Sequence, residues 1–132
     1  AAVLISKIII PSDNYQVAAG LLALIGHIWP VWLQWEGGKA VATGLGILLG
    51  LSWQVGLSTF GIFLLIISVS KIVSLSSILS ALSLPVLMTL SFGSNFRMSY
   101  FIVSIAAMLI VLWRHRSNIK RLIEGTEPKI NQ

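Results

Sequence analysis

The stretch from Ile72 to Phe92 reads IVSLSSILSALSLPVLMTLSF and contains no charged residue. A helix that crosses the hydrocarbon core of a bilayer needs about 20 mostly apolar residues, so this stretch is long enough to span a membrane. Lys71 precedes it, and a polar turn from Gly93 to Arg97 follows it. We therefore predict a transmembrane helix at this position.

The composition of the whole chain indicates that lipid is its solvent. Of the 132 residues, 56% are hydrophobic and 10% are charged, and the mean hydropathy is +0.92. A soluble domain carries roughly 25% charged residues. The absence of cysteine excludes disulfides and thiolate metal sites. The net charge of +5 does not indicate a nucleic-acid partner, because the basic residues lie beside apolar runs, as they do in cytoplasmic membrane loops.

Apolar runs recur along the chain and are separated by polar or glycine-containing breaks. Because backbone polar groups in lipid must be paired internally, this pattern predicts an all-α, multi-pass transmembrane helix bundle. We expect about five spans and a cytoplasmic C-terminal helix. The first span is partial, because the opening run AAVLISKIII is too short for a crossing. The other apolar segments are Tyr15–Leu33, Ala40–Leu51, Val55–Val69, Ile72–Phe92 and Tyr100–Trp113.

Counting the crossings brings three polar stretches to one face of the membrane. If the break at Lys39 is cytoplasmic, the chain returns to the same side at Lys71 and again at Arg114. The other side then holds Arg97, with Lys7 near it. This assignment satisfies the rule that cytoplasmic loops carry an excess of lysine and arginine. The predicted cytoplasmic face carries Lys39, Lys71, Arg114, Arg116, Lys120, Arg121 and Lys129.

The first polar stretch places a histidine near a helix end, followed by two glycines and a lysine. Gly37 and Gly38 allow a tight turn with exposed N–H groups, and a new helix begins after Lys39. Free N–H groups at a helix N-terminus beside a lysine suit a phosphate, and Thr43 adds a hydroxyl one turn in. The alternative is a simple glycine turn with a topology anchor. An intramembrane His27 favours the site, because ionisable groups near lipid are costly.

The second polar stretch is a serine-rich helix start after Lys71. Ser74 is the best ligand candidate there, because it lies nearest the charged break. The alternative for Ser77 and its neighbours is helix packing with hydroxyl hydrogen bonds. We interpret Gly46-xxx-Gly50 as a packing motif rather than a chemical one.

The third polar stretch is the basic segment RHRSNIKR that follows the last span. On a helix, Arg114, Asn118 and Arg121 line one stripe, with His115 beside it. The arginine fork suits phosphate oxygens. We therefore expect this stripe to form one wall of a pocket.

The opposite side of the same helix carries Arg116 and Lys120, which we expect to meet lipid head groups. The alternative is that all the charges of this stretch are interfacial anchors. The residues from Gly125 to Pro128 end the helix and could fold back. The sequence contains no metal-binding motif and no paired-carboxylate site, so we expect no cofactor.

Together these stretches resemble a known family, the bacterial acyl-phosphate-dependent glycerol-3-phosphate acyltransferases of membrane phospholipid synthesis. The resemblance rests on three motifs in the family's order and spacing, and it covers the whole chain. The motifs are GHIWPVWLQWEGGKAVATGLG (Gly26–Gly46), VSLSS (Val73–Ser77) and RHRSNIKRLIEGTEP (Arg114–Pro128).

The resemblance implies transfer of a fatty acyl group from acyl phosphate to the 1-hydroxyl of sn-glycerol 3-phosphate. The products are 1-acylglycerol 3-phosphate (lysophosphatidic acid) and phosphate. The resemblance also implies a multi-pass protein of the bacterial plasma (inner) membrane with a cytoplasmic site. Its partners would be acyl phosphate, glycerol 3-phosphate and membrane lipids. Direct supply of acyl phosphate by a synthase is left open.

The matching motifs assign candidate roles to individual residues. The candidate catalytic residues are His27, His115 and Asn118, and either histidine or a substrate phosphate oxygen could accept the hydroxyl proton. The candidate substrate-binding and phosphate-binding residues are Gly37, Gly38, Lys39, Thr43, Ser74, Arg114 and Arg121.

The chain departs from the family pattern in two respects. The family has a first transmembrane helix and then a cytoplasmic loop rich in Gly, Ser and Asn with an arginine, which residues 1–132 lack. We therefore expect a single membrane-embedded acyltransferase domain without its N-terminal span and first motif, with little activity alone. Lys71 also stands where the family usually has arginine, which weakens phosphate binding.

Two other functional classes fit the helices and cations without the resemblance. One is a small membrane transporter or channel subunit with an anion site. Polar residues along the spans would favour this class. The predicted spans are nearly free of charge. The other is an inactive truncated remnant of the enzyme.

Overall fold

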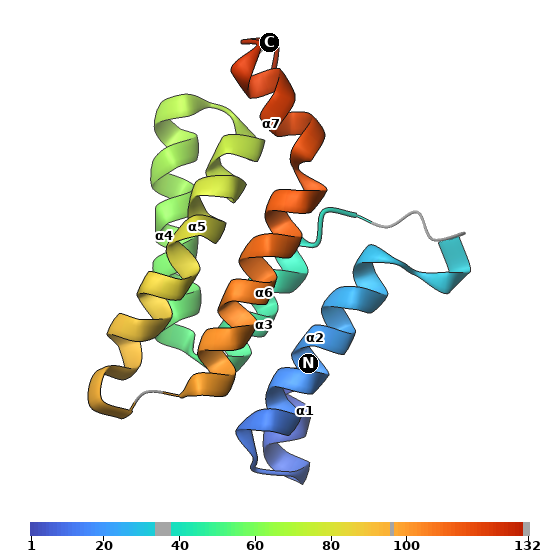
Figure 1. Ribbon diagram of the computed structural model, residues 1–132, viewed down its shortest axis with the longest axis vertical. Helices are drawn as coiled ribbons and strands as arrows, with labels where there is room; N and C mark the ends of the chain where they lie inside the picture. The colour runs from blue at the N-terminus through green and yellow to red at the C-terminus, as the bar shows by residue number, and fades with distance from the viewer. Residues whose placement is uncertain (34–37, 96, 131–132) are drawn as a thin grey trace.

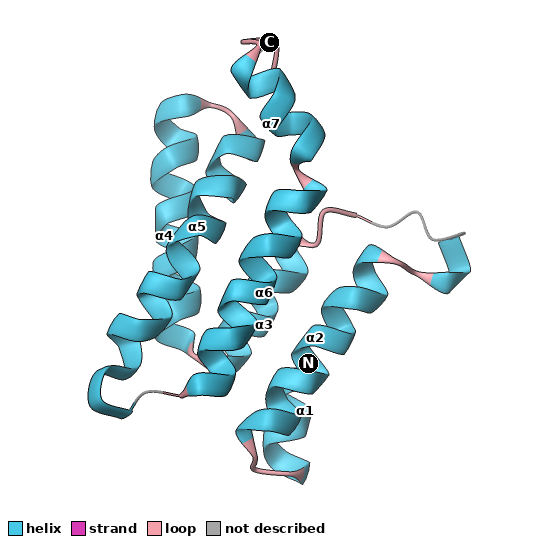
Figure 2. Cartoon of the chain, in the orientation of Figure 1, coloured by secondary structure: helices cyan, strands magenta, loops and turns pink. Residues whose placement is uncertain are grey.

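A computed structural model describes residues 1–33, 38–95 and 97–130 of the chain. Within these residues the protein consists of helices joined by turns, and none of the described residues forms a strand (Figure 2). This confirms the predicted all-α fold. The elements in chain order are α1 (Ala2–Ile9), α2 (Asp13–Ile28), the 3-10 helix η1 (Val31–Leu33), α3 (Val41–Leu51), α4 (Trp53–Ser70), α5 (Val73–Phe92), the 3-10 helix η2 (Gly93–Asn95), α6 (Met98–Arg114) and α7 (Arg116–Ile123).

Successive helices run in alternating directions along the bundle, from α1 to α6, and α7 extends α6 (Figure 1). The α1–α2, α3–α4 and α5–α6 connections therefore lie toward one end, which we call the distal end. The end of α2, the start of α3, the α4–α5 connection and α7 lie toward the opposite end, which we call the site end. The predicted gathering of the three polar stretches is confirmed by this arrangement.

Two residues between helices create the turns that define α4. Ser52 has an extended backbone, with φ −145° and ψ 110°, and its Oγ accepts a hydrogen bond of 3.4 Å from the Val55 N–H. This is the N-cap role that serine favours. Lys71 ends α4 in the left-handed conformation, with φ 58°. Left-handed residues are typical of helix C-termini, so the predicted break at Lys71 is confirmed.

The apolar core takes residues from all the helices from α1 to α6. A Cβ added to Gly50 would lie 3.0 Å from the Val3 Cβ, so this glycine lets α1 contact α3. The packing interpretation is confirmed for Gly50. Nothing described lies within 4 Å of a Cβ added to Gly46, so the interpretation is wrong for that residue within the described part of this chain. The buried core residues are Val3, Val17, Leu48, Leu51, Val55, Leu84, Met88, Tyr100 and Val103.

Hydrogen bonds at the distal end hold the start of α2 against the start of α6. The Tyr100 hydroxyl donates to Gln16 Oε1 at 2.6 Å, and both side chains are buried. Arg97 Nη1 donates to Asp13 Oδ1 at 2.7 Å in an exposed ion pair. The Arg97 guanidinium also lies 5.3 Å from the centre of the Tyr100 ring. The distal end is thus closed by structural contacts.

Large apolar side chains cover the outside of the bundle, as lipid-facing surfaces require. Val69 is 82% exposed and Leu90 is 74% exposed. Among the described residues, α4 and α5 are long and apolar enough to cross a membrane, and α6 with α7 gives a third span if that bent pair is counted as one. The α2 and α3 helices have 16 and 11 residues. They remain predicted spans that are shorter than a full crossing.

One predicted helix boundary is wrong. The segment Tyr15–Leu33 is not one helix, because α2 ends at Ile28 and a 3-10 helix begins at Val31. Pro30 explains the break, since proline disfavours a helical conformation in the residue before it. The predicted separate helix after the last span is observed as α7, and the chain bends by 61° between α6 and α7, at His115.

Candidate functional site

A polar pocket of about 470 Å³ lies at the site end, between the start of α3, the start of α5 and α7. Each of these elements contributes side chains that were predicted from the sequence to bind substrate. The lining includes Lys39, Ser74, His115, Asn118, Arg121 and Glu127. The structure therefore brings together residues from all three polar stretches.

Helix ends hold these side chains in place. Lys39 lies directly before α3, next to Ala40, which is left-handed with φ 57°. The N–H groups of the first turn of a helix lack intrahelical acceptors. Ser74 lies in the first turn of α5 and is buried. Two helix N-termini, whose partial charge is positive, thus lie beside one pocket.

The bend at His115 turns α7 toward the pocket. His115 is 1% exposed, and its Nδ1 lies 2.8 Å from the Val111 carbonyl oxygen. A carbonyl oxygen can only accept a hydrogen bond, so Nδ1 carries the proton in the neutral ring. The lone pair is then on Nε2. A neutral His115 with this tautomer has one nitrogen free to act as a base.

The carboxylate of Glu127 is the centre of the hydrogen bonds in the pocket. It accepts from Ser74 Oγ at 2.5 Å, from Asn118 Nδ2 at 2.6 Å and from Arg121 Nε at 2.7 Å. The Glu127 side chain is only 5% exposed. The tail after α7 therefore folds back onto α5, and the Ile130 N–H donates to the Lys71 carbonyl oxygen at 2.9 Å. The predicted fold-back of this segment is confirmed.

The hydrogen bonds to Glu127 determine its charge state. Burial raises the pKa of the carboxyl group, but the three hydrogen bonds and the charge of Arg121 outweigh burial and lower the pKa from 4.5 to about 2. Glu127 lies outside the spanning helices and is ionised at neutral pH. It neutralises Arg121, and Lys39 supplies a further positive charge to the lining.

One buried polar atom of the pocket has no hydrogen-bond partner among the described residues. Asn118 is 4% exposed, and its Nδ2 donates to Glu127 while its Oδ1 accepts from no described group. Buried polar atoms usually have a partner. Because Oδ1 is an acceptor, it fits a ligand that presents a hydroxyl group.

Four of the predicted site residues that the structure describes do not line the pocket: His27, Gly38, Thr43 and Arg114. His27 is exposed, and its Nε2 would lie 2.8 Å from a Cβ added to Gly38. Arg114 Nη2 donates to the Gly38 carbonyl oxygen at 3.2 Å, which holds the turn against α6. Thr43 lies one turn into α3 and is half-buried. Gly37 lies outside the described residues.

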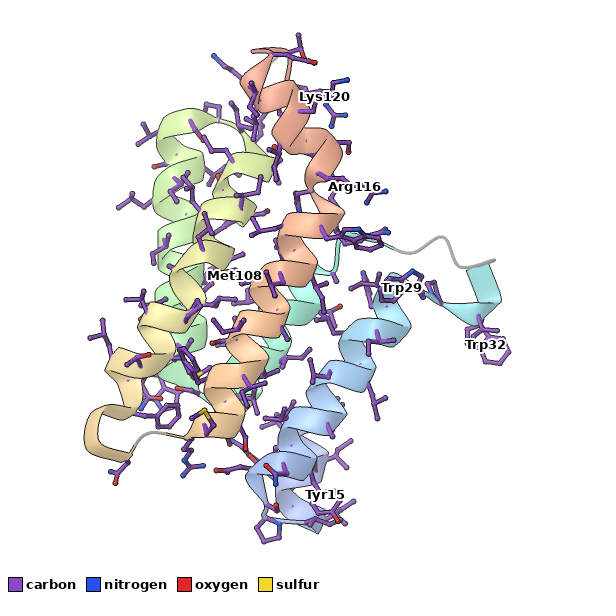
Figure 3. The ribbon with its side chains drawn as sticks, viewed as in Figure 1. Tyr15, Trp29, Trp32, Met108, Arg116 and Lys120 are labelled. Carbon is purple, nitrogen blue, oxygen red and sulfur yellow. The ribbon has the colours of Figure 1, made fainter. Side chains whose placement is uncertain are left out.

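The basic side chains that were predicted to face away from the pocket are exposed. Figure 3 shows Arg116 and Lys120 pointing outward from α7. The Arg116 guanidinium lies 4.9 Å from the centre of the Trp113 ring, and Trp113 packs on Trp29 with ring centres 5.7 Å apart. Their contact with lipid head groups remains a prediction.

An apolar cavity of about 330 Å³ lies between α2, α3, α4, α5 and α6 and extends toward the distal end. Its lining is almost entirely aliphatic and aromatic, with Leu24, Leu48, Phe60 and Leu84 among its walls. Three residues line both this cavity and the polar pocket: Val41, Phe63 and Ser77. A charged pocket and an apolar cavity are therefore neighbours inside the bundle.

Known proteins are similar to this chain in sequence and in fold. The family model for glycerol-3-phosphate acyltransferase matches residues 1–125. The chain belongs to the glycerol-3-phosphate acyltransferase family. A glycerol-3-phosphate acyltransferase of Prochlorococcus marinus (strain NATL1A) is 60% identical over 132 residues, which are 99% of this chain and 67% of that protein. One of Parasynechococcus marenigrum (strain WH8102) is 62% identical over 99% of this chain and 60% of that protein.

Two solved structures share the fold of this acyltransferase-family chain. Both are crystal structures of PlsY (YgiH), an integral membrane glycerol 3-phosphate acyltransferase. The glycerol 3-phosphate form has a TM-score of 0.86 and 30% identity, covering 98% of this chain and 63% of that one. The lysophosphatidic acid form has a TM-score of 0.87 and 31% identity, covering 96% and 64%. This chain is therefore a multi-pass membrane protein that spans about two thirds of the length of its relatives.

The family assignment confirms the resemblance found in the sequence, but the motifs alone did not reveal the role of Glu127. The acidic residue in GTEP follows a glycine at the end of α7, which suggested only a turn. Its three partners lie up to 53 residues away in the chain. Within the described ranges, no group of three or more His, Asp or Glu side chains is placed to hold a metal ion.

Proposed function

We propose that this chain carries the acyl-transfer site of a glycerol-3-phosphate acyltransferase that uses acyl phosphate as its donor. The observation that carries the proposal is the junction of the polar pocket with the apolar cavity at Val41, Phe63 and Ser77. The two substrates both carry phosphate, and one of them also carries a long alkyl chain. A site for both needs cationic and apolar compartments in contact.

The polar pocket supplies what phosphate groups require. Lys39 lies beside the N-terminus of α3, where free N–H groups and the helix dipole favour an anion. Arg121 lines the opposite wall, and its Nε donates to Glu127. Its other guanidinium nitrogens remain geometrically suited to phosphate oxygens. We assign one phosphate to Lys39 and the other to the Arg121 side.

The apolar cavity supplies a place for the acyl chain. Its volume of about 330 Å³ falls in the usual range for ligand pockets of roughly 300–1,000 Å³. The cavity keeps an alkyl chain out of water, where its exposure would cost about 0.8 kcal/mol per methylene group. The acyl carbonyl would then lie at the junction, within reach of the polar lining.

The proposed reaction needs little from the enzyme beyond positioning and charge. The 1-hydroxyl oxygen of glycerol 3-phosphate forms a bond to the acyl carbonyl carbon, and the bond from that carbon to the phosphate oxygen breaks. The phosphate leaves with the electron pair, and the pocket cations stabilise its developing charge. The hydroxyl proton passes to Nε2 of His115 or to a phosphate oxygen. Holding both substrates in contact supplies much of the rate enhancement.

The residues of the pocket divide these tasks according to their contacts. The buried Oδ1 of Asn118 accepts a hydrogen bond from a glycerol hydroxyl. The Glu127 carboxylate holds Asn118 and Arg121 in position, and Ser74 donates to the same carboxylate. His27 lies against Gly38, so we assign it to the turn that precedes Lys39 rather than to proton transfer.

The charge distribution supports a cytoplasmic site in the bacterial inner membrane. The site end carries nearly all the basic residues, as cytoplasmic loops do. Acyl phosphate would enter from the bilayer, where its alkyl chain partitions, and direct transfer from an acyl-phosphate synthase remains a prediction. A transporter role is less favoured. The chain belongs to an acyltransferase family, and the hydrogen bond between Tyr100 and Gln16 closes the distal end of the bundle.

The experiment measures acyl transfer by this chain in two forms. One is the 132-residue chain alone, for which we expect little activity. The other is a chimera in which it replaces the matched segment of the Prochlorococcus marinus relative, which supplies the unmatched third. With palmitoyl phosphate and labelled glycerol 3-phosphate in nanodiscs, the chimera should form lysophosphatidic acid. A folded chimera that forms none would refute the proposed function.

A further inference from the structure

We propose that Gly44 controls passage of the alkyl chain from the polar pocket into the apolar cavity, and so sets the preference for long-chain over short-chain phosphates. This inference rests on the proposed function, because it takes the occupant of the cavity to be the chain of the acyl donor. Gly44, in α3, would determine specificity without taking part in the reaction itself.

The position of Gly44 follows from the geometry of α3. Val41 lines both the pocket and the cavity, and Gly44 lines the cavity three residues further along the helix. With a rise of 1.5 Å per residue, Gly44 lies about 4.5 Å beyond the junction. Leu48 lies deeper on the same wall. A chain that leaves the pocket along the α3 wall therefore passes Gly44 before it reaches the deeper part of the cavity.

Open space in front of Gly44 distinguishes it from glycines that permit helix packing. A Cβ added to Gly44 meets no atom within 4 Å, whereas a Cβ at Gly20 would lie 2.8 Å from an Ile47 side-chain atom. Gly20 is thus required for the contact between α2 and α3. The absence of a side chain at Gly44 serves no such contact with a described residue. It leaves part of the cavity empty.

The occupant of this space is best matched by an unbranched alkyl chain that carries a phosphate. The cavity is apolar along its walls and meets the cationic pocket at Phe63 and Ser77. An apolar ligand without a charged head would fill the cavity but leave the polar pocket, which Lys39 lines, empty. A ligand with a phosphate head and an alkyl tail fills both compartments at once.

A matched control lies two residues further along the same helix. A Cβ added to Gly46 also meets nothing within 4 Å, but Gly46 is exposed and does not line the cavity. Leucine in place of glycine favours a helix at either position. Gly44→Leu and Gly46→Leu therefore make the same chemical change on the inner and outer faces of α3, and both should fold.

The test compares equilibrium binding of butyl phosphate and hexadecyl phosphate to the full 132-residue chain in nanodiscs. Radiolabelled ligands are used, and binding to empty nanodiscs is subtracted. The quantity of interest is the ratio of the two dissociation constants, because lipid partitioning of hexadecyl phosphate affects all variants equally. Gly44→Leu should reduce the preference for the long chain by at least about tenfold. Gly44→Ala should cause a smaller reduction, and Gly46→Leu should match the unmodified chain.

Several outcomes would overturn the inference. It is wrong if the ratio is the same in Gly44→Leu and Gly46→Leu, or if the unmodified chain has no preference for the longer chain. In either case a membrane lipid or another segment occupies the cavity. Equal weakening of both ligands by Gly44→Leu also contradicts it, because butyl phosphate is too short to depend on the deeper cavity. Failure of acyl transfer with intact length-dependent binding would refute the proposed function but not the effect of Gly44 on alkyl phosphate binding.

Discussion

The carboxylate of Glu127 accepts a hydrogen bond of 2.7 Å from Nε of Arg121, six residues earlier in the chain. The same carboxylate binds Ser74 on another helix, 53 residues away. This single side chain therefore connects α5, α7 and the C-terminal tail. Because Arg121 and Asn118 also line the pocket, the shape of the site depends on Glu127.

Replacing this carboxylate should destabilise the site end of the bundle. Glu127→Gln removes the charge that two buried donors and the half-exposed Arg121 share, and hydrogen bonds to charged groups contribute about 1.5–3 kcal/mol each before rearrangement. We expect a loss of about 2 kcal/mol in the free energy of unfolding. Denaturant titration in detergent, followed by far-UV circular dichroism, measures it.

Glu124→Gln is the matched control for that substitution. Glu124 lies on α7's end, 49% exposed, and is 3.9 Å from Lys120. Exposed ion pairs contribute roughly 0–1 kcal/mol. If the two variants lose equal stability, the central role of Glu127 is wrong.

The stability of the protein should depend on pH through Glu127. Its pKa is lowered from 4.5 to about 2 in the folded protein, so the folded state binds fewer protons than the unfolded state between these values. Stability from this group is therefore fully present above about 4.5 and is lost as the pH falls toward 2. The difference in unfolding free energy between the unmodified chain and Glu127→Gln should shrink across this window. A difference independent of pH would contradict the assignment.

The distal end should contribute to stability without affecting substrate binding. Tyr100→Phe removes the donor to buried Gln16 Oε1 and should cost about 1–3 kcal/mol, because that acceptor is left unpaired. Asp13→Asn weakens the exposed pair with Arg97 and should cost at most about 1 kcal/mol. Binding of butyl phosphate should be unchanged in both variants. Weakened binding in a folded Tyr100→Phe variant would place the site elsewhere.

Removing a lysine charge from the pocket should weaken phosphate binding more than removing a lysine charge from the surface. Lys39→Met removes a charged donor from the pocket lining, and binding of butyl phosphate should weaken by about tenfold or more. Lys120→Met is the control, because Lys120 is 78% exposed and points away from the bundle (Figure 3). Equal affinities in the two variants, measured by equilibrium binding in nanodiscs, would refute the role assigned to Lys39.

The positions of the helices were predictable because local signals mark their ends. Lys71 and the turn from Gly93 to Arg97 interrupt long apolar runs, and the structure ends α4 and α5 at these points. Counting the crossings then placed Lys39, Ser74 and His115 at one end without any knowledge of tertiary contacts. This prediction succeeded because a membrane-spanning chain has few ways to alternate between two sides.

Other features depend on contacts that the sequence does not encode locally. The 61° bend at His115 turns α7, and the tail then reaches Ser74 across the pocket. A straight helix would have kept Arg114 in the same stripe as Asn118, but Arg114 instead contacts the Gly38 carbonyl. The apolar cavity and the open side of Gly44 arise from the packing of five helices, which no single segment predicts.

The most direct test of the central claim is the acyl-transfer rate of the chimera after substitution of pocket residues. We predict that His115→Ala reduces turnover by about 100-fold or more, the range for loss of a general base, and that Lys39→Ala raises the KM for a phosphate-bearing substrate. Arg116→Ala, on the outer side of α7, should retain normal rates. Normal turnover in both His115→Ala and Lys39→Ala would show that this pocket is not the site of acyl transfer.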